Sequence, residues 1–426
     1  MRRSTVAGSR SLFGMLLFAL VSLSIRVFAQ SPERVLYAFT NPHGSGRSPF
    51  APLIADASGN LYGTTIVGGV NDVGCVFELS RGDDGEWKET ILHAFSGPDG
   101  HFPSAALVFD KFGNLYGTTE FGGSYDFGVV FKLSPSSDGA WTETVLHSFG
   151  NGNDGFFPRS NLIFDKDGNL DGTTLMSKGS QTAGSVYRLS PGPNGWTETL
   201  LYVFPTYGFD GYNPNGGLVM DGEGNLYGVT GSGGAYEKGT VYELARLKDG
   251  TYKESVIYSF GLYEGAGPNS GLTLDHKGIL YGTTAYSYLY QDSGIVFRLK
   301  RDAAGSWTED ILHQMTGRDG SWPLGPVAFD RLGNLYAAAS SGGRNGQGSV
   351  FELTPTPSGP WKETVLHFFD YTYPSGTDGA DPLAGVIVRH GRVFGTTSLG
   401  GGPANGGTVF EIKPPTLVPD SSQAEQ

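Results

Sequence analysis

The chain has 426 residues, of which 67 are Gly and 24 are Pro, and 13% are aromatic. So much Gly and Pro excludes a helix-rich protein, and the aromatic content excludes a disordered or collagen-like chain, because these rings need a core in which to pack. A formal net charge of −13 argues against nucleic-acid and anionic-lipid partners, whose phosphates the surface would repel.

Residues 1–29 have the features of a signal peptide. Basic residues precede an apolar run from Leu12 to Ser24, and Val27-Phe28-Ala29 matches the small-x-small cleavage rule. We therefore expect export to the extracellular space or the periplasm. No second apolar run approaches the roughly 20 residues that span a bilayer, so no membrane insertion is expected after cleavage. Cleavage would leave 25 Lys and Arg against 42 Asp and Glu, a net charge of −17.

Three motifs recur in the same order along the rest of the chain, and together they define a tandem repeat. A hairpin motif of the form G-N-L-Y-G-T-T begins, at intervals of 54 to 58 residues, at Gly59, Gly113, Gly168, Gly224, Gly278, Gly333 and, in degenerate form, Gly391. Each copy is followed by the strand pattern V-[FY]-x-[LI]. The third motif, W-x-E-x-[ILV]-[LI]-[HY]-x-F, follows six copies, and its seventh Glu is Glu33, near the start of the predicted mature chain.

Each period contains four segments with the alternation of half-buried strands, as in 107–110, 114–119, 129–133 and 141–149. Four antiparallel strands in about 55 residues are typical of one propeller blade. The sequence therefore predicts an all-β fold, a seven-bladed β-propeller over residues 30–413, followed by a disordered tail at 414–426. Because the chain opens with a fourth strand and closes with a third, the N-terminal strand is expected to complete the last blade.

The three motifs resemble the Gloeo-Verruco ("GloVer") tandem repeat, found in exported bacterial proteins. The resemblance extends over essentially the whole predicted mature chain, with all three motifs in order. It implies a secreted β-propeller and no particular activity.

Residues that recur in every repeat are interpreted as structural. An Asp that precedes x-x-G-[NI] is explained by a hairpin turn, and it occurs at Asp56, Asp110, Asp165, Asp221, Asp275 and Asp330. Only the Asp165 copy has the spacing of a cation loop, and it lacks enough oxygen ligands, so no cofactor is expected and calcium stays a weak alternative. The outer-strand position occupied by His93, His147, His313 and His367 is Tyr in other copies. A metal ligand cannot be exchanged so freely, so we expect packing residues and no metal.

The segment before most inner strands reads D-G-x-x-P. The acids at its first position are Asp99, Asp154, Asp210, Asp319 and Asp378, with Glu264 in one more copy. One hypothesis is that these acids ring the mouth of the channel and attract cations or a cationic ligand. The alternative is that Asp-Gly forms a turn and that Pro begins a strand at a position that needs no N–H.

Departures from the repeat are the better functional leads. In the fifth repeat Tyr286, Tyr288 and Tyr290 replace a Gly-rich loop, and Tyr263, Trp322 and Asp319 lie in loops expected on the same face. Aromatic rings beside carboxylates suit sugars, although such rings can equally plug the channel. Two departures in the third repeat complete the predicted ligand-binding set: Asp171, which replaces the Tyr of the hairpin motif, and Asn161, which is polar where other inner strands have small residues.

We therefore expect a secreted, monomeric binding or scaffold module that recognises a carbohydrate or a cell-surface glycan, and we assign no catalytic residue. The alternative is a propeller enzyme acting on polysaccharide, a lyase or a glycoside hydrolase, which would need two carboxylates about 5 to 10 Å apart in one cleft. A radical copper oxidase is disfavoured, because the single Cys75 has no His in its motif.

Overall fold

The structure is a computed structural model that describes residues 33–40, 44–152, 154–177, 183–261, 263–287, 293–357 and 360–415, all within one compact unit, Ser31–Gln426. The regular elements in these ranges are strands. Within them no helix has the length and apolarity needed to cross a membrane. The predicted signal peptide, most of the predicted tail, Tyr288 and Tyr290 lie outside the described residues.

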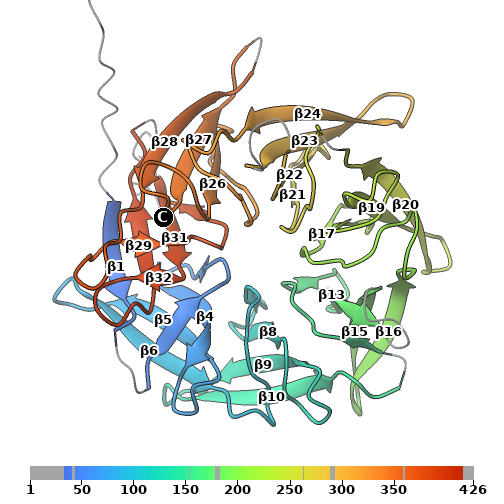
Figure 1. The fold of residues 1–426 in the computed structure, drawn as a ribbon. Helices are drawn as coiled ribbons and strands as arrows, with labels where there is room; N and C mark the ends of the chain where they lie inside the picture. Colours follow the sequence, from blue (N-terminus) through green and yellow to red (C-terminus); the bar gives the residue numbers. More distant parts are fainter. Residues whose placement is uncertain are drawn as a thin grey trace, which may run out of the picture. The chain divides into compact units, whose positions relative to one another are not determined.

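Within the described residues the strands form seven antiparallel sheets of four or five strands arranged in a ring (Figure 1), with two further two-stranded pairs, which confirms the predicted propeller. Blade 1 comprises β3 (Ile54–Ala55), β4 (Leu61–Gly68), β5 (Cys75–Arg81) and β6 (Trp87–Ala94), with β2 (Gly46–Pro49) also paired to β4. Blade 2 comprises β7 (Val108–Phe109), β8 (Leu115–Thr119), β9 (Val129–Pro135) and β10 (Trp141–Ser148). Blade 3 comprises β12 (Ile163–Phe164), β13 (Leu170–Thr174), β15 (Ser185–Gly192) and β16 (Gly195–Val203), beside the pair β11 (Gly155–Phe156) and β14 (Met176–Ser177).

The remaining blades repeat this order. Blade 4 comprises β17 (Val219–Met220), β18 (Leu226–Thr230), β19 (Thr240–Arg246) and β20 (Tyr252–Ser259). Blade 5 comprises β21 (Thr273–Leu274), β22 (Leu280–Thr284), β23 (Ile295–Arg301) and β24 (Trp307–Gln314). Blade 6 comprises β25 (Ala328–Phe329), β26 (Leu335–Ala339), β27 (Ser349–Thr354) and β28 (Lys362–Phe368). Blade 7 comprises β30 (Ile387–Arg389), β31 (Arg392–Thr397), β33 (Thr408–Ile412) and β1 (Glu33–Ala38), beside the pair β29 (Gly379–Ala380) and β32 (Leu399–Gly400).

The ring is closed by the first strand of the chain. β1 pairs antiparallel with β33, with Glu33 opposite Ile412 and Ala38 opposite Thr408. In Figure 1 the blue β1 accordingly lies beside the red strands of blade 7. The predicted completion of the last blade is confirmed, and it leaves β33 paired on both sides rather than exposed as a sheet edge.

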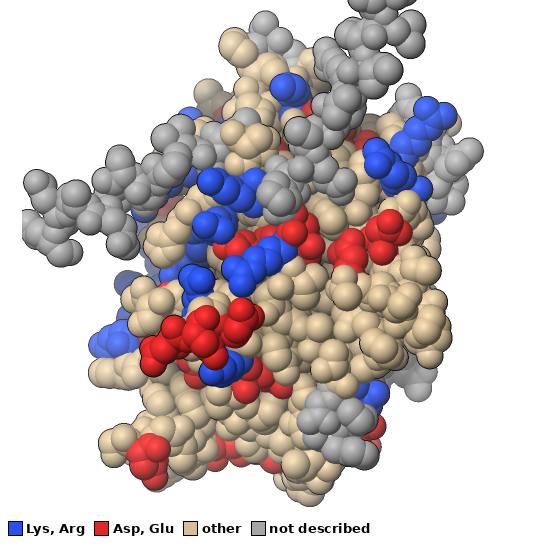
Figure 2. All heavy atoms as spheres, turned by 90° about the vertical axis from the view of Figure 1, so that its left-hand side faces the viewer, with Lys and Arg blue, Asp and Glu red and all other residues tan. Residues whose placement is uncertain are grey.

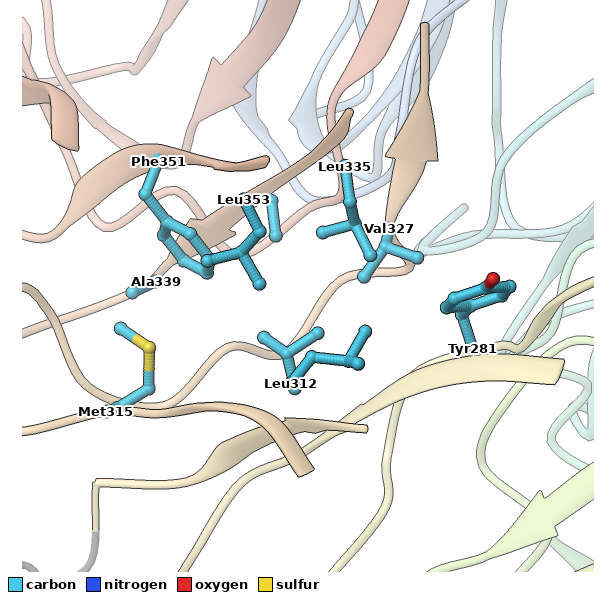
Figure 3. Packing of buried hydrophobic residues seen from close by; sticks show 10 residues of the cluster. Tyr281, Leu312, Met315, Val327, Leu335, Ala339, Phe351 and Leu353 are labelled. Atoms are coloured by element: carbon cyan, nitrogen blue, oxygen red, sulfur yellow. The ribbon is translucent and has the colours of Figure 1, made fainter. Parts of the chain in front are cut away.

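Apolar side chains fill the space between neighbouring blades. Between blades 5 and 6, Leu312 and Met315 point toward Ala339, Phe351 and Leu353 (Figure 3), and all five are buried. Because each sheet buries both of its faces in this way, no blade could exclude water from its core alone, and the blades stabilise one another.

The Asp-containing hairpins have the predicted structural role. In blade 2, Asp110 Oδ1 accepts hydrogen bonds from the backbone amides of Phe112 and Asn114, each at 2.9 Å. Its Oδ2 accepts from the Asn114 side chain at 2.6 Å and from the Tyr116 hydroxyl at 3.1 Å. A carboxylate whose two oxygens hold one turn in this way acts as a turn former.

The charges are mixed on the side of the molecule where blades 7 and 1 meet. Acidic and basic patches lie next to one another there (Figure 2). The excess of acidic residues therefore does not produce a single-sign field on this side.

Candidate binding site at the channel mouth

The structure places the acids of the D-G-x-x-P segments between blades, where each belongs to an inter-blade cluster. We use this term for three residues: an outer-strand His or Tyr, the residue at the acid position that follows it, and the Glu of the W-x-E motif in the next blade. The clusters are Tyr37–Ser45–Glu89, His93–Asp99–Glu143, His147–Asp154–Glu198, Tyr202–Asp210–Glu254, Tyr258–Glu264–Glu309, His313–Asp319–Glu363 and His367–Asp378–Glu33. None of these acids is among the described residues that line the channel mouth, so the hypothesis of an acidic ring there is corrected.

Burial and like charge act together inside the clusters. Burial, followed by the negative charge of Asp99, raises the pKa of Glu143 to about 7. Burial and the charge of Asp210 raise the pKa of Glu254 to about 7 in the same way. Because two carboxylates that share a poorly hydrated site cannot both ionise freely, these Glu residues hold protons up to near-neutral pH.

Asp319, one of the predicted ligand-binding residues, is held inside such a cluster. Its Oδ2 is hydrogen-bonded to His313 Nε2 at 3.0 Å, and its Oδ1 accepts from the Thr316 amide at 2.8 Å and hydroxyl at 2.9 Å. Burial alone would raise the pKa of Asp319, but these hydrogen bonds outweigh it and hold the pKa below its usual value. Both oxygens face protein groups rather than the aromatic loops.

Asp171 is fully buried and forms a two-pronged ion pair. Arg188 donates from Nε to Asp171 Oδ1 and from Nη2 to Oδ2, each at 2.7 Å, and its Nη1 lies 3.4 Å from Asp165 Oδ2. In blade 2 the turn Asp is instead bonded by Tyr116. In blade 3, Arg188 thus contacts the turn Asp165, as Tyr116 contacts Asp110 in blade 2. Asp171 holds Arg188 in place, which is a structural role away from the channel mouth.

A cavity of about 530 Å³ opens at the mouth of the channel and is lined by residues from all seven blades. In each blade this lining begins two residues after a residue with left-handed backbone, with a Pro between the two. The seven left-handed residues are Ser48, Phe102, Phe157, Asn213, Gly267, Trp322 and Asp381, with φ between 54° and 63°. Their shared geometry turns the chain inward, so that the residue after each Pro faces the cavity.

The cavity has one polar and one apolar wall. We call polar wall the five long or hydrogen-bonding side chains near the rim in blades 2 to 5, Ser104, Arg159, Asn161, Asn215 and Asn269, beyond which the lining of blades 2 and 3 also includes apolar residues such as Leu107 and Leu162. The apolar wall comes from blades 1, 6 and 7 and consists of Phe50, Leu324 and Leu383. The residue after Pro thus differs in chemistry from blade to blade, and it is a signal in the sequence that marks the channel mouth.

Two buried polar atoms of the polar wall lack a hydrogen-bond partner among the described residues. Asn215 Nδ2 donates to Asn269 Oδ1 at 3.3 Å, while Asn215 Oδ1 and the Ser104 hydroxyl have no hydrogen-bond partner within the described ranges. Arg159 Nε lies 3.0 Å from Glu120 Oε2. Asn161, a predicted ligand-binding residue, does lie in this wall, and its side chain rests on Gly217 of blade 4, where a Cβ atom would clash with it.

The predicted aromatic patch is formed in part. The rings of Tyr286 and Trp322 meet edge to face, with centroids 6.2 Å apart, and the two residues are 42% and 43% exposed. Trp322 lies two residues before Leu324 of the apolar wall, so the patch continues that wall outward between blades 5 and 6. Tyr263 is 64% exposed in the loop that precedes blade 5. Tyr288 and Tyr290 cannot be placed, because they lie outside the described residues.

Comparison with known proteins gives a family. The family model described as the Gloeobacter/Verrucomicrobia repeat matches residues 27–177 and 160–410. No curated protein matches the sequence. Among solved structures, the chain is similar to a candidate 6-phosphogluconolactonase from Bacteroides uniformis, with a TM-score of 0.49 and 14% identity over 74% of this chain and 86% of that chain. It is also similar to a gluconolactonase from Xanthomonas campestris, with a TM-score of 0.41 and 16% identity over 72% and 86% of the two chains.

Proposed function

We propose that this chain, which belongs to the Gloeobacter/Verrucomicrobia repeat family, is an exported binding module whose channel mouth recognises a carbohydrate or a cell-surface glycan. The observation that carries the proposal is the division of one cavity into an amide-rich wall and an apolar wall. A sugar ring has the matching division, with hydroxyl groups around its edge and C–H groups on its faces.

The polar wall supplies the hydrogen bonds that such a ligand requires. The side chains of Asn161, Asn215 and Asn269 each carry one acceptor and two donors, so they can bind hydroxyl groups in either direction. A volume of about 530 Å³ lies within the range of small-molecule sites and is large enough for one or two sugar units.

The Tyr286–Trp322 patch extends the site beyond the mouth. Because it continues the apolar wall at Leu324, a chain of sugars can leave the cavity between blades 5 and 6 and stack on exposed rings. Tyr263, on the same side, would lengthen this path.

Binding is favoured over catalysis because of the kind of residues at the mouth. The described residues that line the cavity include neither Asp nor Glu, whereas glycoside hydrolysis requires a pair of carboxylates beside the scissile bond. The nearby Glu120 is paired with Arg159 and is buried.

A glycan array with purified residues 31–426 tests the proposal. We expect selective binding of one class of glycan, without release of products when the bound glycan is incubated and analysed by mass spectrometry. Release of shorter or unsaturated sugars would support the enzyme alternative. Absence of binding to any glycan would contradict the proposal.

A further inference from the structure

The seven inter-blade clusters differ in how well their polar atoms are satisfied. His93 Nε2 and His313 Nε2 are each hydrogen-bonded at 3.0 Å to the Asp of their cluster, and His367 Nε2 is hydrogen-bonded at 3.1 Å to Asp378. Between blades 2 and 3, His147 Nε2 lies 3.3 Å from Asp154 Oδ2 and has no hydrogen-bond partner among the described residues. The contact between His and Asp is therefore longer in this cluster than in the other three clusters that contain a His.

Two further atoms of the same cluster have no partner. Asp154 is only 3% exposed, yet its Oδ1 is unpaired within the described part of the chain, and so is Glu198 Oε1. His147, Asp154 and Glu198 each bring one ligand atom to within 4.8 Å of the others. The Glu Oε1 atom is unsatisfied in most of the clusters, so the features that distinguish this one are His147 Nε2 and Asp154 Oδ1. Unsatisfied buried polar atoms are uncommon, and two of them beside an unsatisfied Glu oxygen indicate a missing ligand with positive charge.

We propose that His147 Nε2, Asp154 and Glu198 bind a divalent transition-metal ion of the zinc class, which joins blade 2 to blade 3. One imidazole and two carboxylates are a donor set that Zn²⁺ accepts, with water as the fourth ligand, whereas Ca²⁺ takes six to eight oxygen ligands. Tetrahedral ligands at about 2.0 to 2.1 Å from Zn²⁺ lie about 3.3 Å apart. One ligand atom of each of the three residues lies within 4.8 Å of the others, so modest side-chain movements would bring them to this separation.

The surrounding structure already orients the three ligands. Asp154 Oδ2 accepts the backbone amides of Gly150 at 3.1 Å and Asn151 at 3.2 Å, which fixes the carboxylate plane and leaves Oδ1 for the ion. The His147 ring packs edge to face on Phe149, with centroids 4.6 Å apart. Such outer contacts hold metal ligands in place before the ion arrives.

Calorimetric titration of metal-free residues 31–426 with ZnCl₂ tests the proposal, with CaCl₂ as a second titrant. We expect Zn²⁺ to bind and Ca²⁺ to show no binding at this site. The His147→Gln and Glu198→Gln variants should each lose one equivalent of Zn²⁺, with affinity at this site lowered about 100-fold or more, because even loss of an outer partner typically lowers metal affinity 10- to 100-fold. The matched control is His93→Gln, which changes the equivalent residue in a cluster whose His is already hydrogen-bonded, and it should keep the equivalent.

Cobalt provides a readout of the ligands themselves. Co²⁺ added to the metal-free protein should give visible absorption typical of a tetrahedral site in the wild type and in His93→Gln, and this absorption should be lost in both ligand variants. Two ligand variants are used so that, if one of them misfolds, the other still tests whether the metal site is lost. The same zinc stoichiometry and affinity in the folded ligand variants and the wild type, or no zinc binding by the wild type, would overturn the proposal.

Discussion

Pro49 of blade 1 packs so closely on Gly407 of blade 7 that a Cβ atom on Gly407 would lie 2.8 Å from Pro49 Cδ. Gly407 has φ of +93°, and its carbonyl accepts the Phe39 amide at 3.0 Å, so the contact lies where the ring closes. The same contact occurs at the other six blade boundaries, between Gly74 and Pro103, Gly128 and Pro158, Gly184 and Pro214, Gly239 and Pro268, Gly294 and Pro323, and Gly348 and Pro382. The Gly of one motif and the Pro of another thus form one repeated inter-blade contact.

This contact predicts that Gly407→Ala destabilises the closed ring. Gly59→Ala is the matched control, because Gly59 has φ of +90° but no heavy atom within 4 Å of its Cβ position. Both variants should lose the about 1 to 2 kcal/mol typical of a left-handed Ala. Gly407→Ala should lose further free energy of unfolding in urea titrations, because its Cβ would clash with the Thr397 carbonyl oxygen and lie 2.8 Å from Pro49 Cδ, so both must move. Equal losses in the two variants would show that the Pro–Gly contact does not contribute.

A second prediction concerns the Asp171–Arg188 pair. Asp171→Ala would leave Arg188, which is nearly buried, with one fewer counter-ion, and should lower the free energy of unfolding by about 3 to 5 kcal/mol. The double variant Asp171→Tyr with Arg188→Lys copies the Tyr116 and Lys132 of blade 2 and should restore much of the loss. Urea unfolding measures both effects. If Asp171→Ala instead unfolds like the wild type and only glycan binding is lost, Asp171 is a ligand-binding residue after all.

The raised pKa of Glu143 predicts a specific pH dependence. Its pKa is about 7 in the folded protein against about 4.5 for an ordinary Glu, so the folded state holds the proton more tightly. Its contribution to stability is therefore fully present below about pH 4.5 and is lost as pH rises through 7. A Gln at this position cannot ionise, so Glu143→Gln should match the wild type in melting temperature at pH 4.5 and exceed it at pH 8. A difference between the two proteins that does not change with pH would contradict this assignment.

The fold could be predicted because the repeat determines it. Three motifs in constant order define a blade, and the Glu33 copy of the third motif, separated from the rest of its repeat, indicates how the ring closes. The turn role of residues such as Asp110 was also predictable, because all the groups it binds lie within six residues.

The site was harder to predict because it depends on contacts between repeats. An acid such as Asp99 precedes a loop, and sequence alone could not show that its carboxylate turns sideways toward Glu143 rather than inward to the mouth. Apart from Asn161, the two walls arise from one position, the residue after Pro, which is Asn269 in one blade and Leu324 in the next. Their separation becomes visible only once the blades are placed around the ring.

The most direct test of the proposed binding site is the affinity of an array-positive oligosaccharide for Trp322→Ala, measured by calorimetry. Phe112→Ala is the control, since Phe112 is an aromatic that is even more exposed, at 75%, in the hairpin between β7 and β8 and outside the mouth. We predict that Trp322→Ala weakens binding by about 1 to 3 kcal/mol, the usual loss for an aromatic anchor. Phe112→Ala should bind like the wild type. Unchanged affinity in Trp322→Ala, or the same loss in both variants, would contradict a glycan site at the channel mouth.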